Sequence, residues 1–209
     1  MKILEAFKRW FEGSKVVNPD GSPRVVYHGT YNLEKPQHFT KFRVDRDLGA
    51  HFAEDPGLAN LFALEEDPEI SSEAFDSFSA RVYPVYLSIK KPLFLPDIGQ
   101  WDQYNYWLET MSRFLATRAQ RFSPDVKKIM SCLFYFSRDN NIEPSGEDIK
   151  KAIKAFGYDG IYYLNECEEA PSGNTTCWIA FDQKQIKSVF NIGRFSRRSA
   201  DIRNPYERL

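Results

Sequence analysis

Two histidines are the side chains best placed in this sequence for hydrogen bonding or proton transfer near neutral pH. His28 follows the apolar run at residues 25–27 and precedes Gly29, and His51 lies in the small-residue run 49–53. Imidazole titrates near neutrality, and a neighbouring glycine lets a ligand or another backbone approach closely. A histidine at a strand end is as often a hydrogen-bonded structural group as a ligand contact. The residues alone therefore leave both interpretations open.

The cysteines offer less chemistry. Cys132, Cys167 and Cys177 are odd in number, and their spacing fits no zinc site and no C-x-x-C motif. This pattern favours reduced thiols. A nucleophilic role for Cys177 is not indicated, because neither a partner histidine nor a helix N-terminus is evident beside it, and a small buried thiol is the expected alternative.

The elements that carry these residues are indicated by hydrophobic periodicity and by turn signals. Asp55 and Pro56 predict the start of a helix, as N-cap and first helical residue. Strand patterns flank a block of helical patterns, which predicts an α+β fold. The predicted helices are 3–11, 56–64, 101–121, 126–134 and 149–156 with Gly157 as the cap; the strands are 25–27, ending at 28–30, then 82–89, 92–95, 161–164, 178–181 and 186–190; loops are expected over 31–48 and 65–79.

Composition describes an ordinary globular chain. The 209 residues suit a single domain over 1–209, and the net charge of −1 gives no general attraction to nucleic acid or anionic lipid. No stretch reaches the apolar length of a membrane span, and the N-terminus lacks the uninterrupted apolar run of a signal peptide. We therefore expect no membrane partner, and a cytoplasmic location or delivery into a host cell without a recognisable signal. Arginines 194, 197, 198 and 203 are expected in a solvated tail.

Several motifs in order resemble those of ADP-ribosyltransferases of the diphtheria-toxin and poly(ADP-ribose) polymerase type. The similarity is greater to the ADP-ribosyltransferase-like domain in polyvalent proteins of phages and mobile elements, and it covers nearly the whole chain except residues 97–145 and the last dozen. The matching segments are 10–17 (WFEGSKVV), 25–30 (VVYHGT), 49–54 (GAHFAE) with 59–60, 157–161 (GYDGI) with Asn165, 178–188 (WIAFDQKQIKS) and 191–195 (NIGRF).

This resemblance implies split antiparallel β-sheets with flanking helices, a helical insertion at about 97–145 and a C-terminal tail at about 196–209. It also implies NAD as the substrate and no metal. His28 would hydrogen-bond the adenosine ribose hydroxyls, the Gly29 backbone would pair with the nicotinamide carboxamide, and Thr30 would support the turn.

The second motif implies further contacts. Relatives place a tyrosine on the nicotinamide ring, where this chain has His51, an imidazole that still stacks but presents less surface. Phe52 alternates to the other face and is expected in the core. Gly49 and Asn165 complete the expected NAD-binding set.

The third motif lacks the usual glutamate that stabilises positive charge on the ribose. Cys177 takes its position. Glu168 is the first candidate to replace that carboxylate, ahead of Glu166 and Glu169, although all three would more often be solvated loop charges. Gln185 is another polar candidate. The expected catalytic set is therefore His28, His51, Glu168, Cys177 and Gln185.

Two regions have alternative interpretations. Lys187 and Ser188 are expected at a surface strand edge or, alternatively, at a phosphate. The aromatic residues of the inserted helices are expected in the core, with a lid or target-docking surface as the alternative; they are Trp101, Tyr104, Tyr106 and Trp107.

The predicted function is mono-ADP-ribosylation. The enzyme would cleave the nicotinamide–ribose bond of NAD and transfer ADP-ribose to a macromolecule, with a protein as the expected acceptor and nucleic acid left open. Transfer to water would make it an NAD glycohydrolase. The alternatives are a catalytically degenerate module that binds NAD or ADP-ribose, a toxin-like RNA-modifying domain on the same fold, and a structural protein of a mobile element.

Overall fold

A computed structural model describes residues 2–32, 39–45, 48–65, 79–101, 104–191 and 195–203. His38, Arg194 and most of the loop expected at 65–79 lie outside these residues. The elements are α1 (Lys2–Phe11), β1 (Val26–Asn32), β2 (Ala50–Ala53), α2 (Pro56–Glu65), β3 (Ser79–Leu87), β4 (Pro92–Phe94), α3 (Tyr104–Arg118), the 3₁₀ turn η3 (Ala119–Arg121), α4 (Pro124–Asn140), α5 (Gly146–Ala155), β5 (Gly160–Leu164), β6 (Thr176–Ala180), the 3₁₀ turn η4 (Gln183–Gln185) and β7 (Ile186–Ser188).

The strands confirm the α+β prediction. They are hydrogen-bonded in the order β4-β5-β6-β2-β1-β3-β7, and each neighbouring pair is antiparallel except the parallel pair β4–β5. The pair β1–β2 is joined through one register pair, Tyr27 with Ala53, whereas β1 and β3 align over seven residues. The sheet therefore consists of two halves, β4-β5-β6-β2 and β1-β3-β7, that meet at a narrow seam.

The strand that carries the first histidine is longer than predicted. β1 continues to Asn32 and pairs with β3 along its whole length, from Val26 opposite Val85 to Asn32 opposite Ser79. The prediction that the strand ends at residues 28–30 is therefore wrong, because long-range pairing with β3 stabilises an extended backbone that local residue types did not indicate. Thr30 lies inside the strand and supports no turn.

The start of α2 and the end of α5 follow the predicted signals. Other bounds differ: α3 begins at Tyr104 and not at residue 101, α4 is longer than the predicted 126–134, and α5 begins before the predicted residue 149. The Asp55 carboxylate accepts hydrogen bonds from the backbone N–H groups of Gly57 (2.6 Å) and Leu58 (3.0 Å), which confirms it as the cap of α2. Ser145 and Asp148 form a reciprocal capping box at α5, and Gly157 follows that helix with φ +83°.

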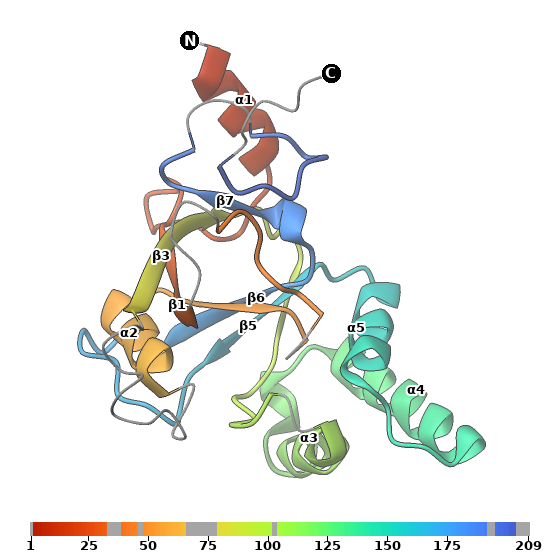
Figure 1. Cartoon of the computed structure of the whole chain (residues 1–209). Helices are drawn as coiled ribbons and strands as arrows, with labels where there is room; N and C mark the ends of the chain where they lie inside the picture. The colour runs from red at the N-terminus through yellow and green to blue at the C-terminus, as the bar shows by residue number, and fades with distance from the viewer. Residues whose placement is uncertain are drawn as a thin grey trace.

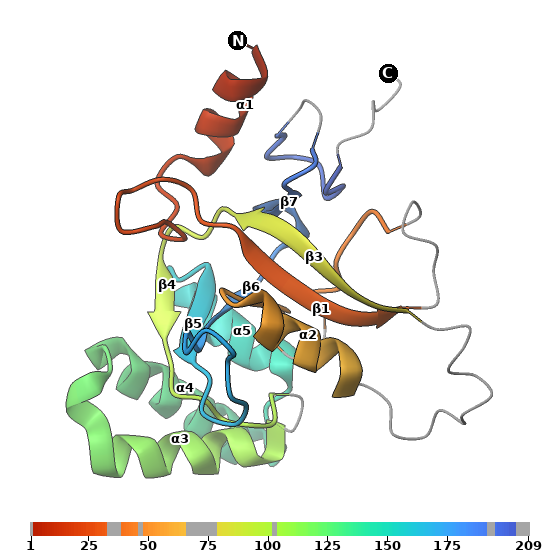
Figure 2. The same cartoon turned by 90° about the vertical axis from the view of Figure 1, so that its left-hand side faces the viewer.

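The two faces of the sheet have different coverings. One face packs against α2 and the helical block α3–α5, and it buries Cys177 and Ile179 of β6. The alternate residues Trp178 and Ala180 belong to a second core on the other face, together with Phe52, as predicted. Figures 1 and 2 show α3 and α4 at one end of the molecule and α1 with the segment after β7 at the other.

The end of the chain differs from the predicted surface edge and solvated tail. Lys187 in β7 is fully buried, and its ammonium group donates to the carbonyl oxygens of Ser199 (2.7 Å) and Asp201 (2.9 Å). Ile202 is also buried, whereas Arg197 and Arg198 are exposed. Residues 195–203 thus cover the edge strand. Two of their carbonyl oxygens accept hydrogen bonds from the Lys187 ammonium group, the group that was considered for phosphate binding. Burial lowers the pKa of Lys187 from 10.5 to about 8.

Candidate functional site

His28 lies beside the seam between the two half-sheets. Its Nδ1–H donates to the backbone oxygen of His51 across 2.7 Å, so a side-chain bond supplements the sparse pairing of β1 with β2. The ring is half-buried and contacts Phe42 (centroids 4.9 Å apart) and Phe52 (5.5 Å). Burial lowers the pKa of His28 from 6.5 to about 4. The imidazole is therefore neutral at pH 7, and because a carbonyl only accepts, Nε2 is left as an acceptor.

His51 points to the opposite face of the sheet. Its ring meets Trp101 edge-on at 5.6 Å, and its Nδ1 lies 3.3 Å from the hydroxyl oxygen of Tyr163 in β5. Trp101 also contacts Tyr163, with ring centroids 4.7 Å apart. The indole Nε1–H of Trp101 is buried and has no hydrogen-bond partner among the described residues. His51 is thus part of an aromatic group on the side of the sheet that faces the helical block.

Cys177 belongs to the same face as His51. It pairs with Ala53 of β2 and with Tyr163 of β5, and only 1% of its surface is exposed. Burial first, and then the negative charges of Asp97 and Glu168, raise its pKa to about 12, although a hydrogen bond with Tyr163 opposes this. Cys177 is therefore a neutral thiol at pH 7.

Glu168 is held near this group by a local turn. The Asn165 side chain donates to the Glu168 carboxylate across 2.6 Å, and the Asn165 amide oxygen accepts the backbone N–H of Glu168 at 2.9 Å. Asn165 is buried and shapes the turn, while Glu166 and Glu169 are exposed. Of the three glutamates considered, Glu168 is the one that influences the pKa values of both Tyr163 and Cys177.

Asp97 is a second carboxylate at this site that the sequence analysis missed. It is buried, and it accepts the backbone N–H of Gly99 (2.9 Å) and of Glu166 (2.8 Å). It therefore ties the loop that carries Trp101 to the turn that carries Glu168. The local sequence Pro-Asp-x-Gly at 96–99 is a turn signal, but the contact with Glu166 joins residues far apart in the chain.

Two glycines of the site make room for neighbouring backbone. A Cβ atom at Gly29 would lie 1.6 Å from the carbonyl oxygen of Ala59, so glycine lets α2 pack directly on β1. At Gly49 a Cβ would lie 2.3 Å from the oxygen of Ala180 in β6. The structure explains both glycines by close packing within the protein, and a contact of either backbone with NAD stays a prediction.

Gln185 has a structural position at the other end of β6. Its amide oxygen accepts the backbone N–H groups of Phe181 (3.0 Å) and Asp182 (2.9 Å), and its NH₂ group donates to the oxygen of Asp159 (2.7 Å). These bonds join η4 to the chain just before β5. The structure therefore brings Glu168 and Cys177 together with His51, places His28 on the opposite face of the sheet, and does not bring Gln185 into this group.

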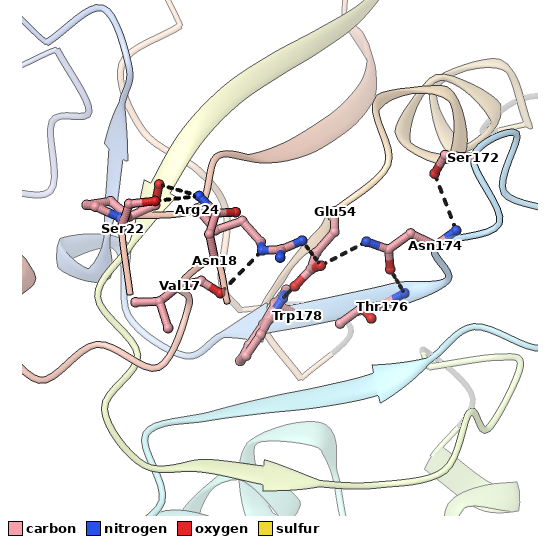
Figure 3. Close-up of polar contacts among 10 residues, drawn as sticks. Val17, Asn18, Ser22, Arg24, Glu54, Ser172, Asn174, Thr176 and Trp178 are labelled. Carbon is pink, nitrogen blue, oxygen red and sulfur yellow. Dashed lines mark hydrogen bonds and ion pairs between the residues drawn. The ribbon is translucent and has the colours of Figure 1, made fainter. Parts of the chain in front are cut away.

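Glu54 forms a polar network that the sequence analysis also missed. Its carboxylate pairs with Arg24 and accepts hydrogen bonds from Asn174 Nδ2 (2.9 Å) and Trp178 Nε1 (3.0 Å), with 9% of the side chain exposed. Figure 3 shows the carboxylate between Arg24 on one side and Asn174 on the other. It connects the turn before β1 to β2 and to the loop before β6, so it fixes the strand on which Cys177 lies.

The described part of the chain shows no group of three His, Cys, Asp or Glu side chains that could hold a metal ion. In the same residues, no helix is both long enough and apolar enough to cross a membrane.

A comparison with protein families covers the range in which these residues lie. The chain matches the family described as ADP-ribosyltransferase in polyvalent proteins over residues 18–195, and it belongs to that family. This range contains His28, His51, Cys177, Asp97 and Glu168. The family makes the protein an ADP-ribosyltransferase-type domain, and the ADP-ribosyltransferase family uses NAD as its substrate. No curated protein and no solved structure matches the chain.

Proposed function

We propose that this protein cleaves NAD at the nicotinamide–ribose bond and transfers a single ADP-ribose to a protein acceptor. The observation that carries the proposal is the pair of His28 and His51 at the seam, where the His28 ring is hydrogen-bonded to the His51 backbone oxygen across 2.7 Å. Neutral His28 has an acceptor at Nε2 that suits the O–H groups of a ribose. His51 presents an aromatic face among Trp101 and Tyr163 that suits the nicotinamide.

The electrostatic surroundings of Cys177 support charge stabilisation without the usual glutamate. Asp97 and Glu168 raise the pKa of Cys177, so their negative charges act at this place. A field that disfavours a thiolate favours the positive charge that develops on the ribose as nicotinamide leaves. Asp97 contributes more than Glu168 to the raised pKa of Cys177. In this proposal Glu168 is the carboxylate that faces the ribose, because both Asp97 oxygens accept backbone N–H groups.

The first experiment is release of nicotinamide from NAD by the purified chain, with and without a protein acceptor. We expect His28→Ala to reduce release at least a hundredfold and Glu168→Gln about tenfold, because glutamine keeps the acceptor for Asn165 but removes the charge. Glu169→Gln, an exposed neighbour with the same charge change, is the matched control and is expected to behave as wild type. Thermal unfolding establishes that each variant is folded.

A binding assay separates the enzyme from a degenerate binding module, which the buried Cys177 in place of glutamate favours. We expect His28→Ala to lose both NAD and ADP-ribose, and His51→Ala to keep ADP-ribose, since His51 is proposed to face the nicotinamide. Binding of NAD with no release under any condition would support the module instead. Wild-type protein that binds neither ligand would contradict the proposal.

A further inference from the structure

A cavity lies at the opposite end of β5 and β6 from Cys177. It has a volume of about 300 Å³ and is formed where the start of β5, the end of β6, η4, α5, α1 and the C-terminal segment meet. From Cys177 to Phe181, which lines the cavity, the chain advances roughly 13 Å as an extended strand. Neither histidine of the proposed NAD site lines it. It is therefore a separate feature of the molecule.

Positive side chains converge on this cavity from distant parts of the sequence. Lys90 follows β3, Lys154 lies in α5 and Lys184 lies in η4. Among the described residues none of these three lysines forms an ion pair. Arg197 is the fourth cation, and it is already engaged by Glu12 at 3.5 Å and by the backbone oxygen of Arg9.

The two carboxylates that line the cavity accept hydrogen bonds from backbone N–H groups. Asp159 accepts the N–H groups of Lys90 (2.9 Å) and Lys91 (2.7 Å), and Asp182 accepts that of Lys184 (2.9 Å). Because Glu12 already pairs with Arg197, the three lysines and the two aspartates of the lining leave a net charge of +1, in a chain whose net charge is −1. The positive charge of the lysines therefore exceeds the negative charge of the acids beside them.

We propose that this cavity binds a diphosphate or triphosphate group, either free or carried by a nucleoside. Several ammonium groups on separate segments suit a ligand with several charged oxygens, because each phosphoryl group accepts charge-assisted hydrogen bonds from a different side. A volume of about 300 Å³ is at the lower end of the range for small-molecule sites and holds a diphosphate. The proposal does not depend on the proposed transferase activity.

Calorimetric titration of the full chain with sodium pyrophosphate, and separately with ADP, tests this site. We expect saturable binding in 50 mM NaCl, weakened at least tenfold in the double variant Lys154→Gln/Lys184→Gln. The control Lys127→Gln/Lys151→Gln makes the same charge change at exposed lysines outside the cavity and is expected to bind as wild type. Both titrations are repeated in His28→Ala, in which the proposed NAD site is disabled. There, tighter binding of ADP than of pyrophosphate identifies a nucleoside-carried ligand, and the reverse identifies the free polyphosphate.

Three results would overturn the proposal. One is the absence of saturable heat for both probes. Another is equal weakening in the two double variants, which would indicate attraction by overall charge. The third is loss of pyrophosphate binding in His28→Ala, which would place the anion in the proposed NAD site. Because pyrophosphate binding is read without NAD turnover, failure here and failure of the transferase proposal are distinguishable.

Discussion

At the scale of single residues, the position of His28 decides its charge. A histidine on a strand can be solvated and titrate near neutrality, but Phe42 and Phe52 surround this ring and desolvation lowers its pKa to about 4. The neutral tautomer with its proton on Nδ1 then follows from the hydrogen bond to the His51 carbonyl. One side chain thus both links two strands and presents a ring nitrogen as an acceptor.

The lowered pKa predicts a pH dependence of stability. Between pH 6.5 and 4 the unfolded chain binds a proton at His28 and the folded chain does not, so the free energy of unfolding falls as the pH decreases through this window. The loss is at most roughly 3 kcal/mol. Urea unfolding at pH 7.5 and pH 4.5 is expected to show a smaller loss in His28→Gln than in wild type. Equal losses in the two proteins would count against a lowered pKa of His28 in the folded protein.

At the scale of elements, Glu54 holds three segments in register. Arg24 precedes β1, Asn174 precedes β6 and Trp178 lies within it, and all three donate to one carboxylate that follows β2. Because β1 and β2 share a single register pair, contacts of this kind add to the weak backbone connection at the seam. The network stabilises the arrangement of strands that places Cys177 opposite Tyr163.

Removal of the Glu54 charge is expected to destabilise the protein. Glu54→Gln keeps the size but leaves Arg24 without its partner, and we expect a loss of about 3 kcal/mol in the free energy of unfolding. Chemical denaturation measures it, with the exposed Glu169→Gln as control. A change within about 0.5 kcal/mol, typical of a surface substitution, would show that the network does not stabilise the fold.

At the scale of the whole molecule, buried Lys187 attaches the C-terminal segment to the sheet. Other contacts also hold the segment between Phe195 and Arg203. Phe195 packs against Phe7 and Trp10, and the backbone of Ile202 is hydrogen-bonded to Ser188 and Thr40. Since the ammonium group donates to two carbonyl oxygens of this segment, it closes the edge of the sheet at β7.

Loss of this attachment is expected to open the segment. Lys187→Met removes both hydrogen bonds and keeps an apolar stem, so trypsin is expected to cleave after Arg203 at least tenfold faster than in wild type. Mass spectrometry of timed digests follows the cleavage. Lys127→Met, at an exposed lysine of α4 outside this region, is the control. Unchanged cleavage after Arg203 would mean that other contacts hold the segment.

The sequence by itself determined the elements and the family. Helical periodicity, the Asp55 cap and the strand patterns predicted an α+β chain, because these signals depend on neighbours within a few residues. The ordered motifs identified the ADP-ribosyltransferase resemblance and His28 and His51, and the match over residues 18–195 confirmed the family.

The tertiary structure alone decided which groups meet. Asp97 and Glu54 act through residues about 70 and 120 positions away, and Gln185 and Lys187 are occupied by backbone groups of other segments. The residue type alone does not show whether a charged side chain is solvated or buried and paired, because its surroundings are set by long-range packing. For the same reason the structure, and not the motif order, showed that the two histidine rings lie on opposite faces of one seam.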